Sequence, residues 1–95
     1  RSDWIEFLPD NFAYDKVVRF RRWDADGNCA ACAINFGHEL RSVHLPVPNA
    51  GPWRDVVSNR TRTAPHGELN LRLSGYSAVL FVPRTGNAPG TLVID

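Results

Sequence analysis

The sequence predicts an all-β protein, an antiparallel β-sandwich of six to eight strands with Greek-key-like connections. Short runs rich in valine, leucine, isoleucine and phenylalanine are separated by clusters of Gly, Pro, Asn and Asp, which is typical of strands and turns. The runs begin about 8 to 16 residues apart, close to the spacing in sandwiches and barrels. Helical periodicity is weak throughout the chain.

One domain is expected, divided into three parts. Residues 1–15 carry aromatic side chains without clear alternation and are interrupted by Pro9, so we expect an irregular arm packed on the sandwich or on a neighbour. Residues 16–83 form the sandwich. Residues 84–95 form a tail or a short edge strand. The chain begins at Arg1 and contains no methionine, which favours a segment of a longer protein.

Six strands are expected, at residues 16–22, 29–36, 40–46, 52–57, 68–73 and 76–83. Asp26-Gly27 tolerates the positive φ of a tight hairpin between the first two. Ser74-Gly75 is short enough to predict that the last two pair with each other. Leucines alternate with polar residues in 68–73, so that strand has one buried face, whereas 76–83 is apolar on both faces and should be covered on two sides.

The stretch GNCAACAINFGHELRSVHL, residues 27–45, raises the question of a metal or redox site. In a strand, Cys29 and Cys32 lie on opposite faces with Cα atoms roughly 10 Å apart, too far for a disulfide. His38 also follows Cys32 too closely for a Cys2His2 zinc site, and no helix start accompanies the CxxC spacing. We therefore expect two small buried hydrophobic side chains, no metal site and no cofactor.

Other candidate catalytic groups are weak. Asp24 and Asp26 are paired carboxylates, but in WDADGN they are expected to form the turn. A calcium loop starting at Asp24 would need a glutamate where Asn35 stands. His38, His44 and the remaining histidine, His66, lie in or beside turns or on a polar strand face, where a solvated role is expected.

Charge excludes some partners. The net charge is +1, and in the cluster at residues 19–23 Phe20 faces away from Arg19 and Arg21, so no nucleic-acid platform is expected. No apolar run approaches the roughly 20 residues of a membrane span. Two reduced cysteines favour a cytoplasmic protein.

Five aromatic residues could stack on sugar rings or pack in cores and interfaces: Trp4, Tyr14, Trp23, Trp53 and Tyr76. Trp53, next to Gly51-Pro52, is expected to be the most exposed of them. Trp53 and Trp23 are therefore the candidate carbohydrate-binding residues.

The central part of the chain resembles the C-terminal β-sandwich domain of the α-amylase family, glycoside hydrolase family 13. The resemblance covers roughly residues 16–83 and rests on the order and spacing of several short motifs. These are an arginine-bearing first strand, a D-x-x-G turn, a strand closing in Asn-Phe, a strand ending in proline, a Gly-x-Trp stretch and an apolar last strand, at Phe20–Arg22, Asp24–Gly27, Asn35–Phe36, Leu45–Pro46, Gly51–Val57 and Tyr76–Phe81.

The resemblance implies a non-catalytic accessory domain of an α-glucan-active hydrolase or transglycosylase, of the branching-enzyme or trehalohydrolase type. It implies that catalysis belongs to a preceding (β/α)8 barrel, which the domain covers, with α-glucan as a second candidate partner. No catalytic residue is expected here. Trp4, Phe7, Val79 and Phe81 are the candidate interface residues. A self-standing carbohydrate-binding module and a protein interaction domain stay open as alternatives.

Overall fold

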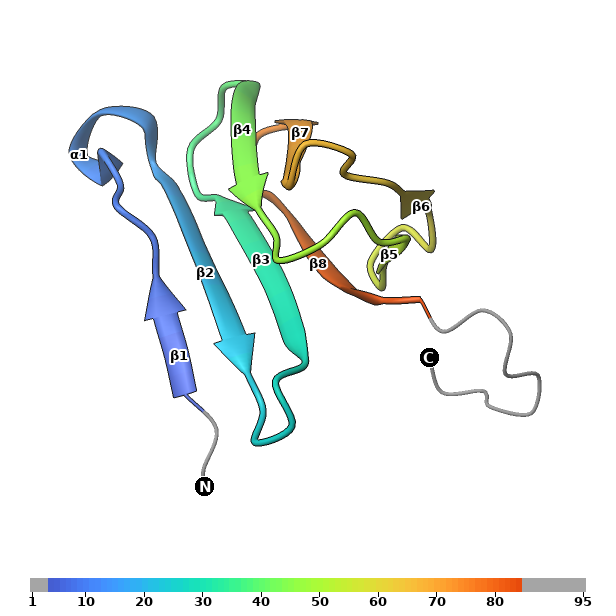
Figure 1. Cartoon of the computed structure of the whole chain (residues 1–95). Helices are drawn as coiled ribbons and strands as arrows, with labels where there is room; N and C mark the ends of the chain where they lie inside the picture. The colour runs from blue at the N-terminus through green and yellow to red at the C-terminus, as the bar shows by residue number, and fades with distance from the viewer. Residues whose placement is uncertain (1–3, 85–95) are drawn as a thin grey trace.

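The computed structural model describes residues 4–84, which form two antiparallel sheets packed face to face (Figure 1). The larger sheet has the strand order β1-β2-β3-β8-β5-β6 and the smaller one pairs β4 with β7. The all-β sandwich predicted from the sequence is therefore confirmed. The strands are β1 (Trp4–Phe7), β2 (Val17–Trp23), β3 (Cys29–Asn35), β4 (Arg41–Pro46), β5 (Trp53–Asp55), β6 (Thr61–Arg62), β7 (Glu68–Leu73) and β8 (Ser77–Pro83).

The hairpin between β2 and β3 forms as expected. Seven residues of each strand pair, from Val17 with Asn35 to Trp23 with Cys29. Gly27 has φ +87° at the tip, a backbone conformation that side chains with a Cβ rarely adopt. The DG dipeptide thus fixes the register of the longest pairing in the molecule.

β7 and β8 do not pair with each other, and the prediction that they would is wrong. β7 pairs with β4 in the smaller sheet, whereas β8 lies between β3 and β5 in the larger one. Gly75 lies against the His38 backbone, and a Cβ there would be 2.4 Å from the His38 carbonyl oxygen. The turn therefore carries the chain from one sheet to the other. The prediction failed because local turn residues do not specify which strand becomes the partner.

The described part of the N-terminal arm, residues 4–15, is more regular than its sequence indicates. Residues Trp4–Phe7 form β1, which pairs antiparallel with β2 at the edge of the larger sheet, and Phe12–Asp15 form one helical turn, α1. Trp4 and Glu6 face one side of the sheet and Ile5 and Phe7 the other. The irregular arm expected for residues 1–15 is thus wrong for β1, because pairing with β2 supplies the order that the short segment lacks. The predicted tail lies, except for Arg84, outside the described residues.

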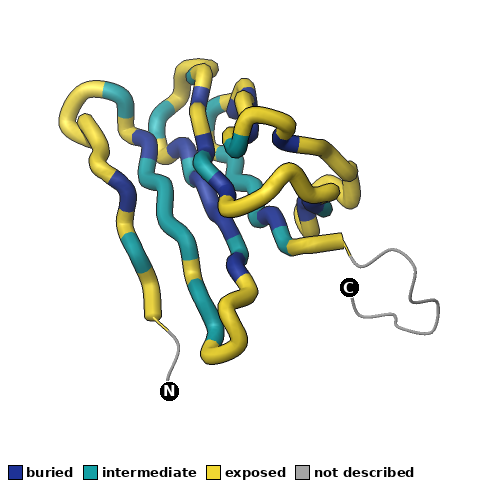
Figure 2. The backbone as a smooth tube through the Cα atoms, in the orientation of Figure 1, coloured by how far each residue is buried: buried dark blue, intermediate teal, exposed yellow. Residues whose placement is uncertain are grey.

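The core lies between the two sheets (Figure 2). Alternate residues of β4 and β7 point into it, while Ser42, His44 and Asn70 on the opposite faces are exposed. The larger sheet contributes its inner face, defined here as the side toward β4 and β7. The fully buried members include Ala31, Ala33, Leu45, Trp53, Ala64, Leu69 and Phe81.

Two buried polar side chains tie loops to this core. Asn35 is 1% exposed; its Nδ2 donates to the carbonyls of Glu39, Leu73 and Ser74 at 2.7, 3.1 and 3.2 Å. Asp55 is 3% exposed and accepts from Val57 N, Ser58 Oγ and Leu80 N. Both groups are satisfied, as most buried polar groups in proteins are.

Candidate functional site

The two cysteines lie on opposite faces of the larger sheet, as their spacing predicted. Cys29 pairs with Trp23 and belongs to the core, whereas Cys32 lies between Phe20 and Leu80 on the other face. Both are free and buried, and burial raises the pKa of both thiols. Thiols of this kind behave as small apolar side chains and are poor nucleophiles.

The acidic turn is a structural feature. Asp24 Oδ1 accepts from the backbone N–H groups of Asp26 and Asn28 at 2.8 and 2.9 Å, and Oδ2 accepts from Asn28 Nδ2 at 3.0 Å. The Asn28 side-chain bond is the main reason why the pKa of Asp24 is lowered. Within residues 4–84, no three His, Cys, Asp or Glu side chains come together as a metal site would require.

Trp53 is buried, and the expectation that it is an exposed sugar platform is wrong. Its side chain is 0% exposed and its Nε1 donates to the carbonyl of Asn49 at 3.0 Å. Gly51 folds over the ring so closely that a Cβ there would be 2.5 Å from the indole Cδ1. From the sequence, we expected the Gly51-Pro52 turn to expose the Trp53 ring. In the structure, Gly51 covers the ring instead.

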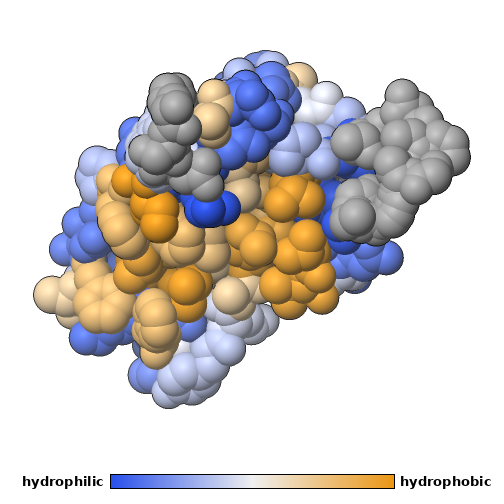
Figure 3. Space-filling view, turned by 90° about the horizontal axis from the view of Figure 1, so that it is seen from below, coloured by the Kyte–Doolittle hydropathy of each residue, from blue (hydrophilic) through white to orange (hydrophobic). Residues whose placement is uncertain are grey.

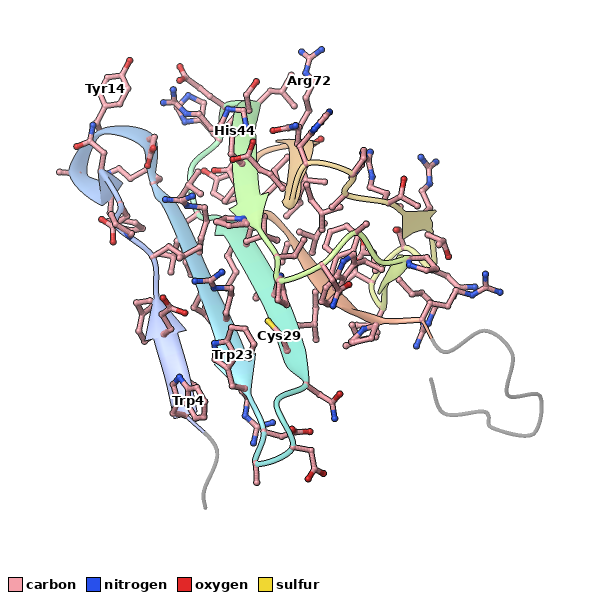
Figure 4. The ribbon with its side chains drawn as sticks, viewed as in Figure 1. Trp4, Tyr14, Trp23, Cys29, His44 and Arg72 are labelled. Atoms are coloured by element: carbon pink, nitrogen blue, oxygen red, sulfur yellow. The ribbon has the colours of Figure 1, made fainter. Side chains whose placement is uncertain are left out.

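Trp23 is paired with Trp4 on the adjacent strand. The ring centroids are 6.0 Å apart and the planes differ by 18°. Trp4 is 46% exposed, while Trp23 is half-buried against the core. Both labelled rings lie at the same end of β1 and β2 (Figure 4).

A salt bridge lies beside this pair. Arg21 donates to Glu6 Oε1 at 2.8 Å, and Trp23 Nε1 donates to the same oxygen at 3.4 Å. The Arg21 guanidinium also lies 5.7 Å from the centroid of the Trp23 ring. The Arg21 bond is the main cause of a lowered pKa at Glu6, so the carboxylate is charged at neutral pH.

The face of the larger sheet that points away from β4 and β7 is mainly apolar, with Arg22 and Arg54 as its charged members, and we call it the outer face. Phe7 pairs with Phe20, Phe20 with Cys32, and Cys32 with Leu80, so one apolar row crosses four strands. Val18, Ile34 and Ala78 form a second row beside it. Phe7 is 66% exposed, and most of the others are half-buried.

A broad, continuous apolar patch is visible when the molecule is seen from below (Figure 3). Apolar patches of this kind mark interaction surfaces more often than ordinary protein surface. The doubly apolar pattern at residues 76–83 predicted an apolar surface on this strand, but the residues selected from the sequence, Val79 and Phe81, are not the ones that form it. Phe81 is 1% exposed and Val79 packs against the core, so both face inward. Leu80 and Val82, which sequence reasoning did not select, face outward.

Of the four predicted interface residues, the structure therefore leaves Trp4 and Phe7 at the surface, on opposite faces of β1. Sequence reasoning also missed Glu6, whose link to Arg21 depends on the pairing of β1 with β2. The alternation Val18, Phe20 on one side and Arg19, Arg21 on the other was a signal for the outer face. It is visible in the sequence once residues 17–23 are taken as a strand.

The described part of the chain contains no helix long and apolar enough to cross a membrane.

Comparisons with known proteins agree with one another. The profile of the alpha amylase C-terminal all-beta domain matches residues 10–84. The 1,4-alpha-glucan branching enzyme GlgB of Mycobacterium tuberculosis is 38% identical over 76 residues, which cover 79% of this chain and 10% of that enzyme. GlgB of Mycolicibacterium paratuberculosis is 32% identical over 77 residues, 80% of this chain and 10% of that enzyme.

A solved structure shares the fold. The crystal structure of an AmyP variant in complex with maltotriose superposes with a TM-score of 0.69 at 15% identity, covering 86% of this chain and 16% of that one. The chain thus spans about a tenth of the length of the curated relatives that it matches. On its sequence and its fold, this chain belongs to the alpha-amylase C-terminal all-beta domain family.

Proposed function

We propose that the chain is a non-catalytic accessory domain of an α-glucan-active hydrolase or transglycosylase. In this role the outer face packs against a (β/α)8 catalytic barrel of the same polypeptide. The single observation that carries the proposal is the apolar outer face, which no other segment of residues 4–84 covers. Burying such a surface is favourable by about 25 cal/mol for each Å² removed from water.

The size relation supports a barrel as the occupant. The matched region accounts for only 10% of each branching enzyme, which leaves nine-tenths of each enzyme as room for a catalytic barrel. The free thiols fit a cytoplasmic enzyme, because disulfides are rare in that compartment.

The two alternatives have less support than the accessory role. A self-standing carbohydrate-binding module needed an exposed aromatic platform around Trp53 or Trp23, and Trp53 is buried while Trp23 is half-buried. A protein interaction domain that docks through Val79 and Phe81 needed side chains that instead face the core. The accessory-domain proposal uses the face that is open.

The coding sequence that precedes the Arg1 codon tests the proposal first. We expect a barrel-sized run of alternating strands and helices with acidic residues at the carboxyl ends of strands. A reading frame that starts near Arg1 would contradict the accessory role.

Co-expression tests the docking face directly. The barrel polypeptide encoded upstream is produced with the chain, and we expect the two to co-purify. Leu80→Asp places a charge in the outer face and should abolish co-purification, because a buried unpaired charge is costly. Ser42→Asp is the matched control on the exposed side of the smaller sheet and should have no effect. Equal recovery of both variants would count against docking through the outer face.

A further inference from the structure

The outer face of the larger sheet carries charge of one sign only. The strand pairings place two arginines, Arg22 on β2 and Arg54 on β5, among its apolar side chains. The acidic residues of the same sheet, Glu6 and Asp55, alternate to the inner face. Within residues 4–84, the strands of this sheet therefore contribute no carboxylate to the outer face, and a partner that covers it meets positive charge alone.

Arg54 lies inside the apolar surface. It pairs with Val82 on β8 and with Thr61 on β6, which makes it a diagonal neighbour of Leu80 across the β5–β8 pairing. The residue is half-buried, as expected for an arginine whose methylene groups lie along an apolar surface. A partner that buries Leu80 therefore also removes the Arg54 guanidinium from water.

The guanidinium of Arg54 has few acceptors within the chain. Its one hydrogen bond within residues 4–84 runs from Nη1 to Asn59 Oδ1 at 3.3 Å. Its Nε is shielded from water and has no acceptor in this part of the chain. An arginine side chain has five N–H donors, and burying a charge that is not paired is costly. Arg54 thus lacks the acceptor that a covered arginine requires.

Other arginines of the fold have a carboxylate within the chain. Arg21 donates to Glu6 at 2.8 Å, and Arg41 donates to Glu39 at 3.0 Å. Arg54 forms no such ion pair within the described residues, although it lies on the face that the accessory role requires to be covered. The missing carboxylate must therefore come from the partner.

We propose that a carboxylate of the catalytic barrel pairs with Arg54 when the barrel covers the outer face. The guanidinium donates to both oxygens of an Asp or Glu side chain, which is the geometry that arginine is best suited to form. Apolar contact by itself permits several orientations, whereas an ion pair at one position selects among them. The identity of the partner rests on the proposed function, whereas the acidic group rests on Arg54.

The competing explanation is that Arg54 only stabilises the turn between β5 and β6 through its bond to Asn59. Asn59→Gly removes this bond and tolerates the positive φ of 64° at that position. We expect Asn59→Gly to co-purify with the barrel as the wild type does. Equal loss of co-purification in Asn59→Gly and Arg54→Glu would show that the turn, and not a carboxylate of the barrel, explains Arg54.

Reversal of the charge tests the ion pair in the complex. The chain is co-expressed with the barrel polypeptide encoded upstream. Arg54→Glu places two carboxylates against each other and should lower the recovery of the barrel at least about tenfold. Arg72→Glu makes the same change on an exposed residue of β7, labelled in Figure 4, and should leave the recovery unchanged. Unchanged recovery with Arg54→Glu would overturn the proposal.

Carbodiimide cross-linking locates the carboxylate without relying on a loss of binding. The reagent joins a lysine amine to a carboxylate in contact with it, and the chain contains one lysine, Lys16. Arg54→Lys keeps the charge and should give a new peptide that links position 54 to an Asp or Glu of the barrel, identified by mass spectrometry. Arg72→Lys is the matched control and should give none. An Arg54→Lys complex without this link would count against the ion pair.

The outcomes separate this inference from the accessory role. If Leu80→Asp abolishes co-purification while Arg54→Glu does not, the outer face docks and only the ion pair is wrong. If the wild-type chain itself fails to co-purify with the barrel, the accessory role is wrong and the ion pair with it. Loss of co-purification in Arg54→Glu, together with the cross-link in Arg54→Lys, supports both.

Discussion

At the scale of single residues, Asn35 has the most consequential set of contacts. Its amide nitrogen serves three carbonyls, including those of Leu73 and Ser74 at the crossing from β7 to β8, and its Oδ1 accepts from Gly37 N at 2.9 Å. One side chain thus joins the end of β3 to the turn that separates the two sheets. The asparagine of the Asn-Phe motif that supported the family resemblance therefore has a structural explanation.

Asn35→Ala should lower the free energy of unfolding by about 3 kcal/mol, because one buried and two part-buried carbonyls and one part-buried N–H would lose their hydrogen bonds to this side chain. Urea unfolding followed by tryptophan fluorescence, to which the buried Trp53 contributes, measures the change. Asn70→Ala, on the exposed face of β7, should stay within about 0.5 kcal/mol of the wild type. Similar values for the two variants would mean that the Asn35 bonds are not important for stability.

At the scale of elements, the turn of the β2–β3 hairpin is held together by hydrogen bonds to the carboxylate of Asp24. Asp24 accepts two backbone N–H groups and the Asn28 amide, which lowers its pKa. A carboxyl whose pKa is lower in the folded state stabilises the fold above its unfolded value of about 3.9, and this contribution is lost as the pH falls through the folded pKa.

The wild type should therefore lose stability as the pH is lowered from 5 toward 2, at least in part through this hairpin. Asp24→Asn removes the titrating group, so its urea midpoint should depend less on pH over this interval. Midpoints measured across that range for both proteins provide the test. Glu6, whose pKa is also lowered, keeps part of the dependence in the variant. Parallel curves for the two proteins would exclude a contribution from Asp24.

At the scale of the whole molecule, the two sheets are not equivalent. The smaller sheet covers the central part of the inner face of the larger one and presents polar residues such as Ser42, His44 and Arg72 to solvent. The larger sheet presents an apolar outer face instead. A chain with this asymmetry is stable as a sandwich and still has a surface suited to a further partner.

Without its partner, the isolated chain should self-associate through the outer face. Sedimentation velocity is expected to show a concentration-dependent increase in mass for the wild type. Leu80→Asp should remain monomeric at the same concentrations, and Ser42→Asp should behave as the wild type. A wild-type chain that stays monomeric at high concentration would show that the outer face is too small to drive association.

The sequence by itself determined most of the strands, all but β1 and β6, and the two faces within each of them. β3, β4, β7 and β8 begin and end within about one residue of their predicted limits, since alternation and turn residues are local signals. The opposite placement of Cys29 and Cys32 follows from the same period of two. The motif order was also sufficient to identify the family, whose profile matches residues 10–84.

Only the tertiary structure decided which faces are covered. The pairing of β7 with β4, the order in β1 and the burial of Trp53 all depend on contacts between segments far apart in the sequence. A strand pattern separates two faces but does not state which of them meets the core, so Phe81 was assigned to the surface and Leu80 was missed. The association of Glu6, Arg21 and the tryptophan pair likewise exists only because β1 pairs with β2, and no local rule specifies that long-range pairing.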